Sequence, residues 1–152
     1  MEEPLISDVS VSLSNSKGID NSNNLISISA KQFLKQLADF ESSKRVKAKY
    51  DNKMYYIPYF SNYFLGIEKV IKNISKMASK SFEGYFIVVN NTARNFIIPV
   101  DKSVIDVFSH LGFKAEIQPE FTRELSHFGA INPVVKGFKA RHMEYAVKIW
   151  RD

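Results

Sequence analysis

The feature that most limits the fold of this chain is its longest run of consecutive apolar residues, which spans only Tyr85 to Val89. A helix that crosses a membrane needs roughly 20 such residues, so no transmembrane segment is predicted. A short apolar run is instead typical of a strand that is buried on both faces. Glu2, Glu3 and Asp8 argue against a signal peptide. We therefore expect a cytoplasmic protein that makes no contact with a membrane.

Apolar residues that recur at intervals of three and four predict helices. The first should begin after Ser29 as N-cap and end near Phe40, and the second should run from Ser61 to about Ser79. Asp101 is expected to cap a third helix, and Gly112 should follow its end in the left-handed conformation. Two further helices are predicted over residues 121–128 and 139–150.

Shorter apolar segments predict the strands. Residues 25–28 and 113–118 are each read as a single strand. Two hairpins are expected, one pairing 46–50 with 54–57 around the turn 51–53, the other pairing 85–89 with 96–100. Pro58 should end its strand because it has no N–H for the ladder.

Helices that flank clustered hairpins indicate the α+β class and not a doubly wound parallel sheet. The length of 152 residues fits one domain. Residues 1–24 are rich in Ser and Asn and are interpreted as a flexible N-terminal arm. The prediction is therefore a single α+β domain over residues 25–152, with antiparallel hairpins flanked by helices.

The net charge of +5 is unevenly distributed along the chain. Residues 41–80 contain nine basic and three acidic side chains, a balance of +6, and this stretch also contains six tyrosine and phenylalanine residues between positions 50 and 63. Lysines neutralise phosphates and aromatic rings stack on bases, so the combination is typical of a surface for single-stranded nucleic acid. The competing interpretations are that the lysines serve solubility and that half of the rings belong to the core.

The residues predicted to bind nucleic acid lie in the expected first hairpin and along one face of the following helix. They are Lys44, Arg45, Lys47, Lys49, Lys53, Tyr55, Tyr56, Lys69, Lys72 and Lys76. Lys80 continues the same helical spacing.

No catalytic or metal-binding constellation is predicted. The chain has no cysteine and no phosphate-binding glycine loop, and no cofactor is expected. His110 and His127 each precede a glycine by two residues, which is typical of a helix C-terminus. Glu124 with His127 is read as a surface pair, and Asp106 as a helical residue facing solvent.

The sequence therefore predicts a non-enzymatic domain that binds RNA or single-stranded DNA through its lysine- and tyrosine-rich surface. The main alternative is a viral or plasmid-encoded assembly protein, whose arm and aromatic patch contact a protein partner. A second alternative is a small transferase or hydrolase with a cleft near His110 and His127.

Overall fold

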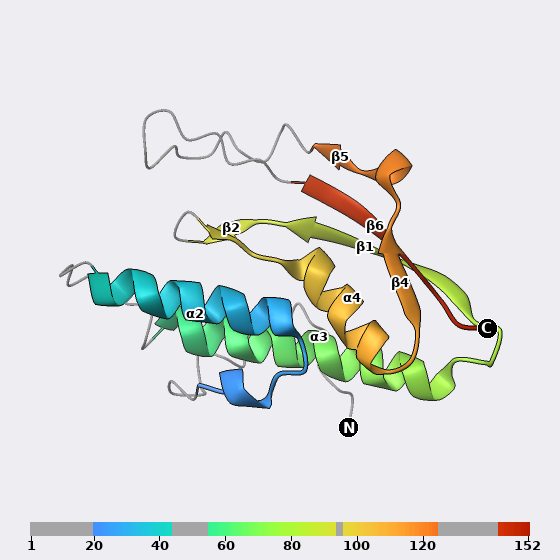
Figure 1. The fold of residues 1–152 in the computed structure, drawn as a ribbon, viewed down its shortest axis with the longest axis horizontal. Coiled ribbons are helices and arrows are strands. Elements are labelled where there is room, and N and C mark those ends of the chain that lie inside the picture. Colours follow the sequence, from blue (N-terminus) through green and yellow to red (C-terminus); the bar gives the residue numbers. More distant parts are fainter. Residues whose placement is uncertain (1–19, 44–54, 94–95, 125–142) are drawn as a thin grey trace, which may run out of the picture.

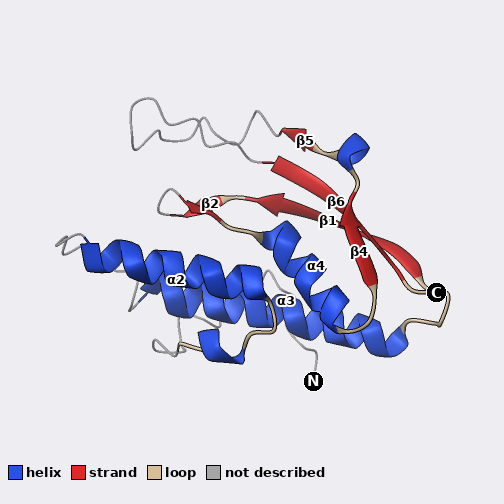
Figure 2. Ribbon diagram, viewed as in Figure 1, coloured by secondary structure: helices blue, strands red, loops and turns tan. Residues whose placement is uncertain are grey.

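The computed structural model describes residues 20–43, 55–93, 96–124 and 143–152 (Figure 1). Three α-helices, α2 (Ile28–Ser43), α3 (Ile57–Met77) and α4 (Val100–His110), pack on one side of an antiparallel sheet. The colouring by secondary structure in Figure 2 shows this helical layer below the strands. The predicted α+β class, with a single domain, is confirmed.

The sheet is arranged around β6 (Met143–Trp150). It pairs on one side with β1 (Glu83–Asn90) and on the other with β4 (Lys114–Ile117) and β5 (Arg123–Glu124), always antiparallel. Two short strands, β2 (Thr92–Ala93) and β3 (Phe96–Ile97), form a separate hairpin. The single-turn 3₁₀ helices η2 (Ser22–Asn24) and η4 (Pro119–Phe121) complete the described elements.

The core lies between the helices and the inner face of the sheet. Alternation along β6 buries Val147 and Ile149, while Phe86 of β1 packs edge-on against Phe108 of α4 at a centroid distance of 5.3 Å. Phe33 of α2 makes similar contacts with Phe60 and Phe64 of α3. The apolar stripes of the helices and the alternate residues of the strands thus meet in one contiguous cluster.

The start of α2 is held by side chains from the other two helices. Ser27 is its N-cap, because the Ala30 N–H donates to Ser27 Oγ at 3.0 Å. Asp106 Oδ2 of α4 accepts from Ser27 Oγ at 3.0 Å and from the Ser29 N–H at 2.8 Å. The predicted cap, Ser29, is therefore wrong by two residues, and Asp106 binds α2 and does not simply face solvent.

Glu68 of α3 completes this arrangement. Its Oε1 accepts hydrogen bonds from the Ile26 N–H at 2.6 Å and the Ser27 N–H at 3.0 Å, and its side chain is only 1% exposed. These bonds satisfy backbone donors that a strand partner would otherwise have to satisfy. The strand predicted for residues 25–28 is absent because the segment joins the helix start instead.

Asn90, the last residue of β1, has the equivalent role for α4. Its Oδ1 accepts from the N–H groups of Val100 and Asp101, at 3.1 and 3.2 Å, and its Nδ2 donates to Asp101 Oδ1 at 2.7 Å. Asp101 lies in the first turn, and the N-cap position is Pro99. The predicted cap, Asp101, is therefore wrong by two residues, and a strand residue supplies the capping oxygen.

The second strand of the predicted first hairpin is wrong. Tyr55 and Tyr56 form a helical turn of their own, Ile57 already belongs to α3, and Pro58 lies in its first turn. Proline is favoured there because the first N–H groups of a helix have no partner within it. Residues 46–50 and the turn lie outside the described residues, and Ser61, the predicted cap, donates to the Pro58 carbonyl inside the helix.

The largest error concerns residues 139–150, which were predicted to be helical. From Met143 onward the chain is the central strand of the sheet. Tyr145, Val147 and Ile149 alternate with Glu144, Ala146 and Lys148, which is the period of a strand. β1 on one side and β4 and β5 on the other satisfy the backbone of β6, and this pairing outweighs the helix propensity of its lysine, alanine and glutamate residues.

Three smaller expectations also differ. β1 pairs with β6 and not with residues 96–100, and it is not buried on both faces, since Tyr85 and Ile87 are exposed. Residues 121–128 do not begin as a helix, because Arg123 and Glu124 form β5; the rest lies outside the described residues. The strand predicted at 113–118 is confirmed as β4.

The end of α4 follows the prediction. Gly112 has φ +86°, and the Phe113 N–H returns to the Phe108 carbonyl at 3.0 Å. A Cβ at Gly112 would meet no atom within 4 Å, so the only penalty for a larger residue is the left-handed backbone.

We expect Gly112→Ala to lower the free energy of unfolding by about 1–2 kcal/mol. His110→Gln should cost about 1 kcal/mol or less. Urea denaturation of both variants measures the ranking, and a larger loss in His110→Gln would contradict it.

Glu68 offers a stronger test of the helix arrangement. Glu68→Ala would leave the buried N–H groups of Ile26 and Ser27 without an acceptor, and we expect it to lower the free energy of unfolding by roughly 2–4 kcal/mol. Glu68→Gln retains an acceptor oxygen and should lose less. Exposed Glu120 supplies the control, because Glu120→Ala should change stability by at most about 0.5 kcal/mol. Equal midpoints for Glu68→Ala and Glu120→Ala would contradict this role.

Candidate nucleic-acid interface

Lysines line the outward face of α3, as the sequence predicted. The spacing of Lys69, Lys72 and Lys76 places them on one side of the helix, and all three are exposed. Lys80, also exposed, follows the end of the helix. The opposite side of α3 supplies Phe64, Ile67 and Ile71 to the core. Burial of this apolar stripe therefore fixes the lysine row toward solvent.

The exposed surface of this region carries no negative charge. Glu68 is the only acidic residue between positions 57 and 82, and its buried side chain is bound to the backbone before α2. Lys72, Lys76 and Lys80 form no ion pair with any residue that the structure describes. Their positive potential is thus not neutralised by neighbours on the same helix.

Aromatic rings gather at the other end of α3. Tyr55 stacks on Tyr59 at a centroid distance of 6.2 Å, and Tyr56 stacks on Phe60 at 6.4 Å. Tyr55 is 45% exposed, whereas Phe60 belongs to the core and Tyr56 packs against it. Burial raises the pKa of Tyr63 above its ordinary value, and the charge of neighbouring Tyr59 raises it further. Of this group, Tyr55 presents its ring most openly to a ligand.

The structure separates these two groups of predicted residues. Tyr55 and Lys69 are about 21 Å apart along the axis, at 1.5 Å per residue over 14 residues. Tyr55 and Tyr56 also lie on a helical turn and not on opposite faces of a strand. Lys44, Arg45, Lys47, Lys49 and Lys53 lie outside the described residues. The described interface is therefore an aromatic end and a lysine end of one helix.

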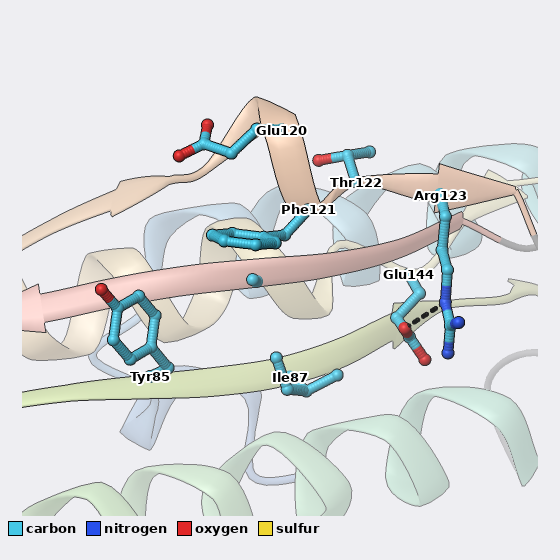
Figure 3. A pocket seen from close by; sticks show the side chains of 8 residues that line it. Tyr85, Ile87, Glu120, Phe121, Thr122, Arg123 and Glu144 are labelled. Atoms are coloured by element: carbon cyan, nitrogen blue, oxygen red, sulfur yellow. Dashed lines mark hydrogen bonds and ion pairs between the residues drawn. The ribbon is translucent and has the colours of Figure 1, made fainter.

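A second surface, which the sequence did not predict, lies on the open face of the sheet (Figure 3). It surrounds a hollow of about 720 Å³, lined by Tyr85 and Ile87 of β1, Phe121 of η4 and Ala146 of β6. Figure 3 shows Phe121 projecting over β6. Tyr85, Ile87 and Val89 are alternate residues, so they lie on one face of β1. A strand that is buried on one face only would leave these side chains on its open face.

The cations of this open face are paired. Arg123 Nε donates to Glu144 Oε1 at 2.6 Å, Lys148 lies 3.3 Å from Glu83, and Lys114 contacts Asp152. The bond to Glu144 raises the pKa of Arg123, and that to Glu83 raises the pKa of Lys148. This face therefore offers apolar contact and balanced charge, in contrast to α3.

A smaller polar cleft of about 280 Å³ lies between α2, β3, α4 and β6. Buried Asp101, already bound to Asn90, faces it together with Tyr145 and Gln32. Burial raises the pKa of Tyr145, and the charge of Asp101 adds to this increase. The carboxylate is thus bound to the Asn90 side chain, whose oxygen caps α4.

The histidine cleft of the alternative enzyme interpretation is not found among the described residues. His110 lies in the last turn of α4, and His127, its proposed counterpart, is outside the described residues. Within the described ranges, no three histidine, aspartate or glutamate side chains are grouped as a metal site would require.

Comparison with protein-family models, curated protein sequences and solved structures finds no match. None of the helices that the structure describes is long and apolar enough to cross a membrane.

Proposed function

We propose that this protein binds single-stranded nucleic acid, RNA or DNA, along the outward face of α3. One observation carries the proposal: the exposed lysines of residues 57–82 have no exposed carboxylate among them, because the only acidic residue there is buried. A row of cations along a helix follows the phosphates of a strand without reading its sequence.

Tyr55 supports a single-stranded ligand in preference to a duplex. An exposed ring at the aromatic end of the same helix can stack on an unpaired base, whereas the bases of a duplex are already stacked on one another. Sequence-independent binding of this kind combines stacking with phosphate contacts. The chain would then act as a cytoplasmic binding module and not as an enzyme.

The open sheet face favours a second candidate function, that of an assembly protein. Tyr85, Ile87 and Phe121 are 52%, 61% and 59% exposed, and apolar groups with paired charges around them are typical of a protein interface. A polyanion would gain little there, because each cation already has a carboxylate. We therefore assign nucleic acid to α3, and a protein partner is the alternative for the sheet.

A salt titration tests the lysine row. Lys72→Gln with Lys76→Gln removes two phosphate contacts, and we expect the slope of log affinity against log salt to fall by roughly 1.4 for a labelled single strand. The matched control is Lys31→Gln with Lys35→Gln, which removes two exposed lysines at the same spacing from α2 and should leave the slope unchanged. Both variants should melt like the parent protein, because the substituted side chains are exposed.

Substitutions of Tyr55 and Tyr56 distinguish a ring that stacks on a base from a ring that stabilises the fold. Tyr55→Ala should weaken binding by about 1–3 kcal/mol while the salt slope stays the same. Tyr56→Ala should mainly lower the melting temperature, because this ring packs against the core. If neither RNA nor single-stranded DNA binds at about 50 mM salt, where phosphate contacts are strongest, the proposal is wrong.

A further inference from the structure

The strand β1 has backbone groups that point away from the sheet. In an extended strand the N–H and C=O of one residue point to the same side, and successive residues alternate. The Ala146 carbonyl accepts from the Gln118 N–H at 2.8 Å, so the backbone groups of Ala146 face away from β1. Tyr145, Val147 and Ile149 therefore turn their backbone groups toward β1.

The register identifies the corresponding residues of β1. Val88, Phe86 and Gly84 lie opposite Tyr145, Val147 and Ile149, so they bond to β6.

It follows that Tyr85, Ile87 and Val89 direct their N–H and C=O groups to the outer edge of β1. The Arg151 N–H, which donates to the Phe82 carbonyl at 3.1 Å, continues the same alternation. Among the described elements, no strand pairs with this edge. An open edge with unpaired backbone groups is a template for a further strand.

A groove of about 420 Å³ lies along this edge. Figure 3 shows β1 running between β6 on one side and α3 on the other. Tyr63, Ile67 and Val70 of α3 form the far wall, and Phe86 and Val88 of β1 the near one. Val100 and Val104 of α4 also line it, and no charged side chain does.

We propose that this groove binds an extended, uncharged peptide segment, which adds to β1 as an antiparallel or parallel strand. Its backbone would pair with Tyr85, Ile87 and Val89, and every second side chain would enter the space beside Ile67 and Val70. The bound side chains on that side are apolar, because a charge would lose its hydration and find no partner in the lining. Three edge residues on alternate positions require a peptide of about five residues, or roughly 17 Å.

The groove beside β1 is independent of the lysine row, which lies on the other side of α3. A nucleic acid cannot substitute for the peptide here, since the groove has no cation for a phosphate. Binding of the peptide and of a nucleic acid can therefore succeed or fail separately.

The test uses the full chain and a synthetic probe, the blocked heptapeptide acetyl-Ser-Val-Thr-Val-Thr-Val-Ser-amide. We expect saturable binding by calorimetry and slower hydrogen exchange of the Tyr85, Ile87 and Val89 amides when the peptide is present. Two further peptides, one N-methylated at its valines and the other at its threonines, keep the side chains, and each loses one set of backbone donors. The peptide whose methylated nitrogens face β1 should bind at least tenfold more weakly, and equal binding of both to the unmethylated level would contradict strand addition.

A matched pair of variants examines the edge itself. Ile87→Pro removes an N–H that points outward and leaves the bonds between β1 and β6 in place, so an edge strand tolerates it. Ile87→Ala changes the same side chain but keeps the N–H. We expect at least a tenfold loss of peptide affinity for Ile87→Pro relative to Ile87→Ala.

A second pair covers the case in which Ile87→Pro does not fold. Val70→Arg places a long cation in the groove and should abolish peptide binding, whereas Asn73→Arg adds the same charge to the exposed face of α3 and should not. The proposal is overturned if the heptapeptide fails to bind the full chain at millimolar concentration. It is also overturned if Val70→Arg binds as well as Asn73→Arg.

Discussion

Two carboxylates fix the helical layer on which the sheet and both surfaces depend. Glu68 of α3 and Asp106 of α4 both bind the backbone at the start of α2, through the N–H groups of residues 26, 27 and 29. The start of a helix has unpaired donors and a partial positive charge, so it stabilises a carboxylate that would otherwise be costly to bury. One short segment therefore sets the positions of three helices relative to one another.

This arrangement also determines the electrostatic character of α3. A glutamate at an exposed position of the helix would pair with a lysine three or four residues away and lower the positive potential. Glu68 is instead used inside the protein, where its Oε1 accepts two backbone hydrogen bonds. The positive potential of the lysine row is thus a consequence of how the helices are joined.

The sequence predicted the helices well where an apolar stripe was long. The stripe from Phe33 to Phe40 and that from Tyr63 to Ile74 both became helices, and the lysines on the polar side of α3 are exposed as predicted. The boundaries were less predictable, because Ser27 and Ser29 are equally good caps by residue type. The choice between them depends on Asp106, which lies 79 residues from Ser27 in the sequence.

The strands were harder to predict for the same reason, since their partners are remote. Residues 143–150 contain good helix formers, and only pairing with β1 and β4 makes them a strand. The open-face hollow was missed because it requires β1 and η4 to meet over β6, which no local pattern indicates. The tyrosine-rich segment predicts a hairpin by local pattern, whereas the structure pairs its rings at i, i+4 along a helix.

The central position of β6 has a consequence for the order of assembly. β1, β4 and β5 all pair with β6, and no described pair joins one of them to another. Glu83 and Trp150 are partners across 67 residues of chain, so the closure of the sheet carries a large loop entropy. On the ribosome, the three helices and β1 emerge well before β6. The sheet cannot form until β6 has also emerged. The helices, whose contacts need only residues up to position 110, can meanwhile collect around the start of α2 and protect the apolar residues that β6 later covers.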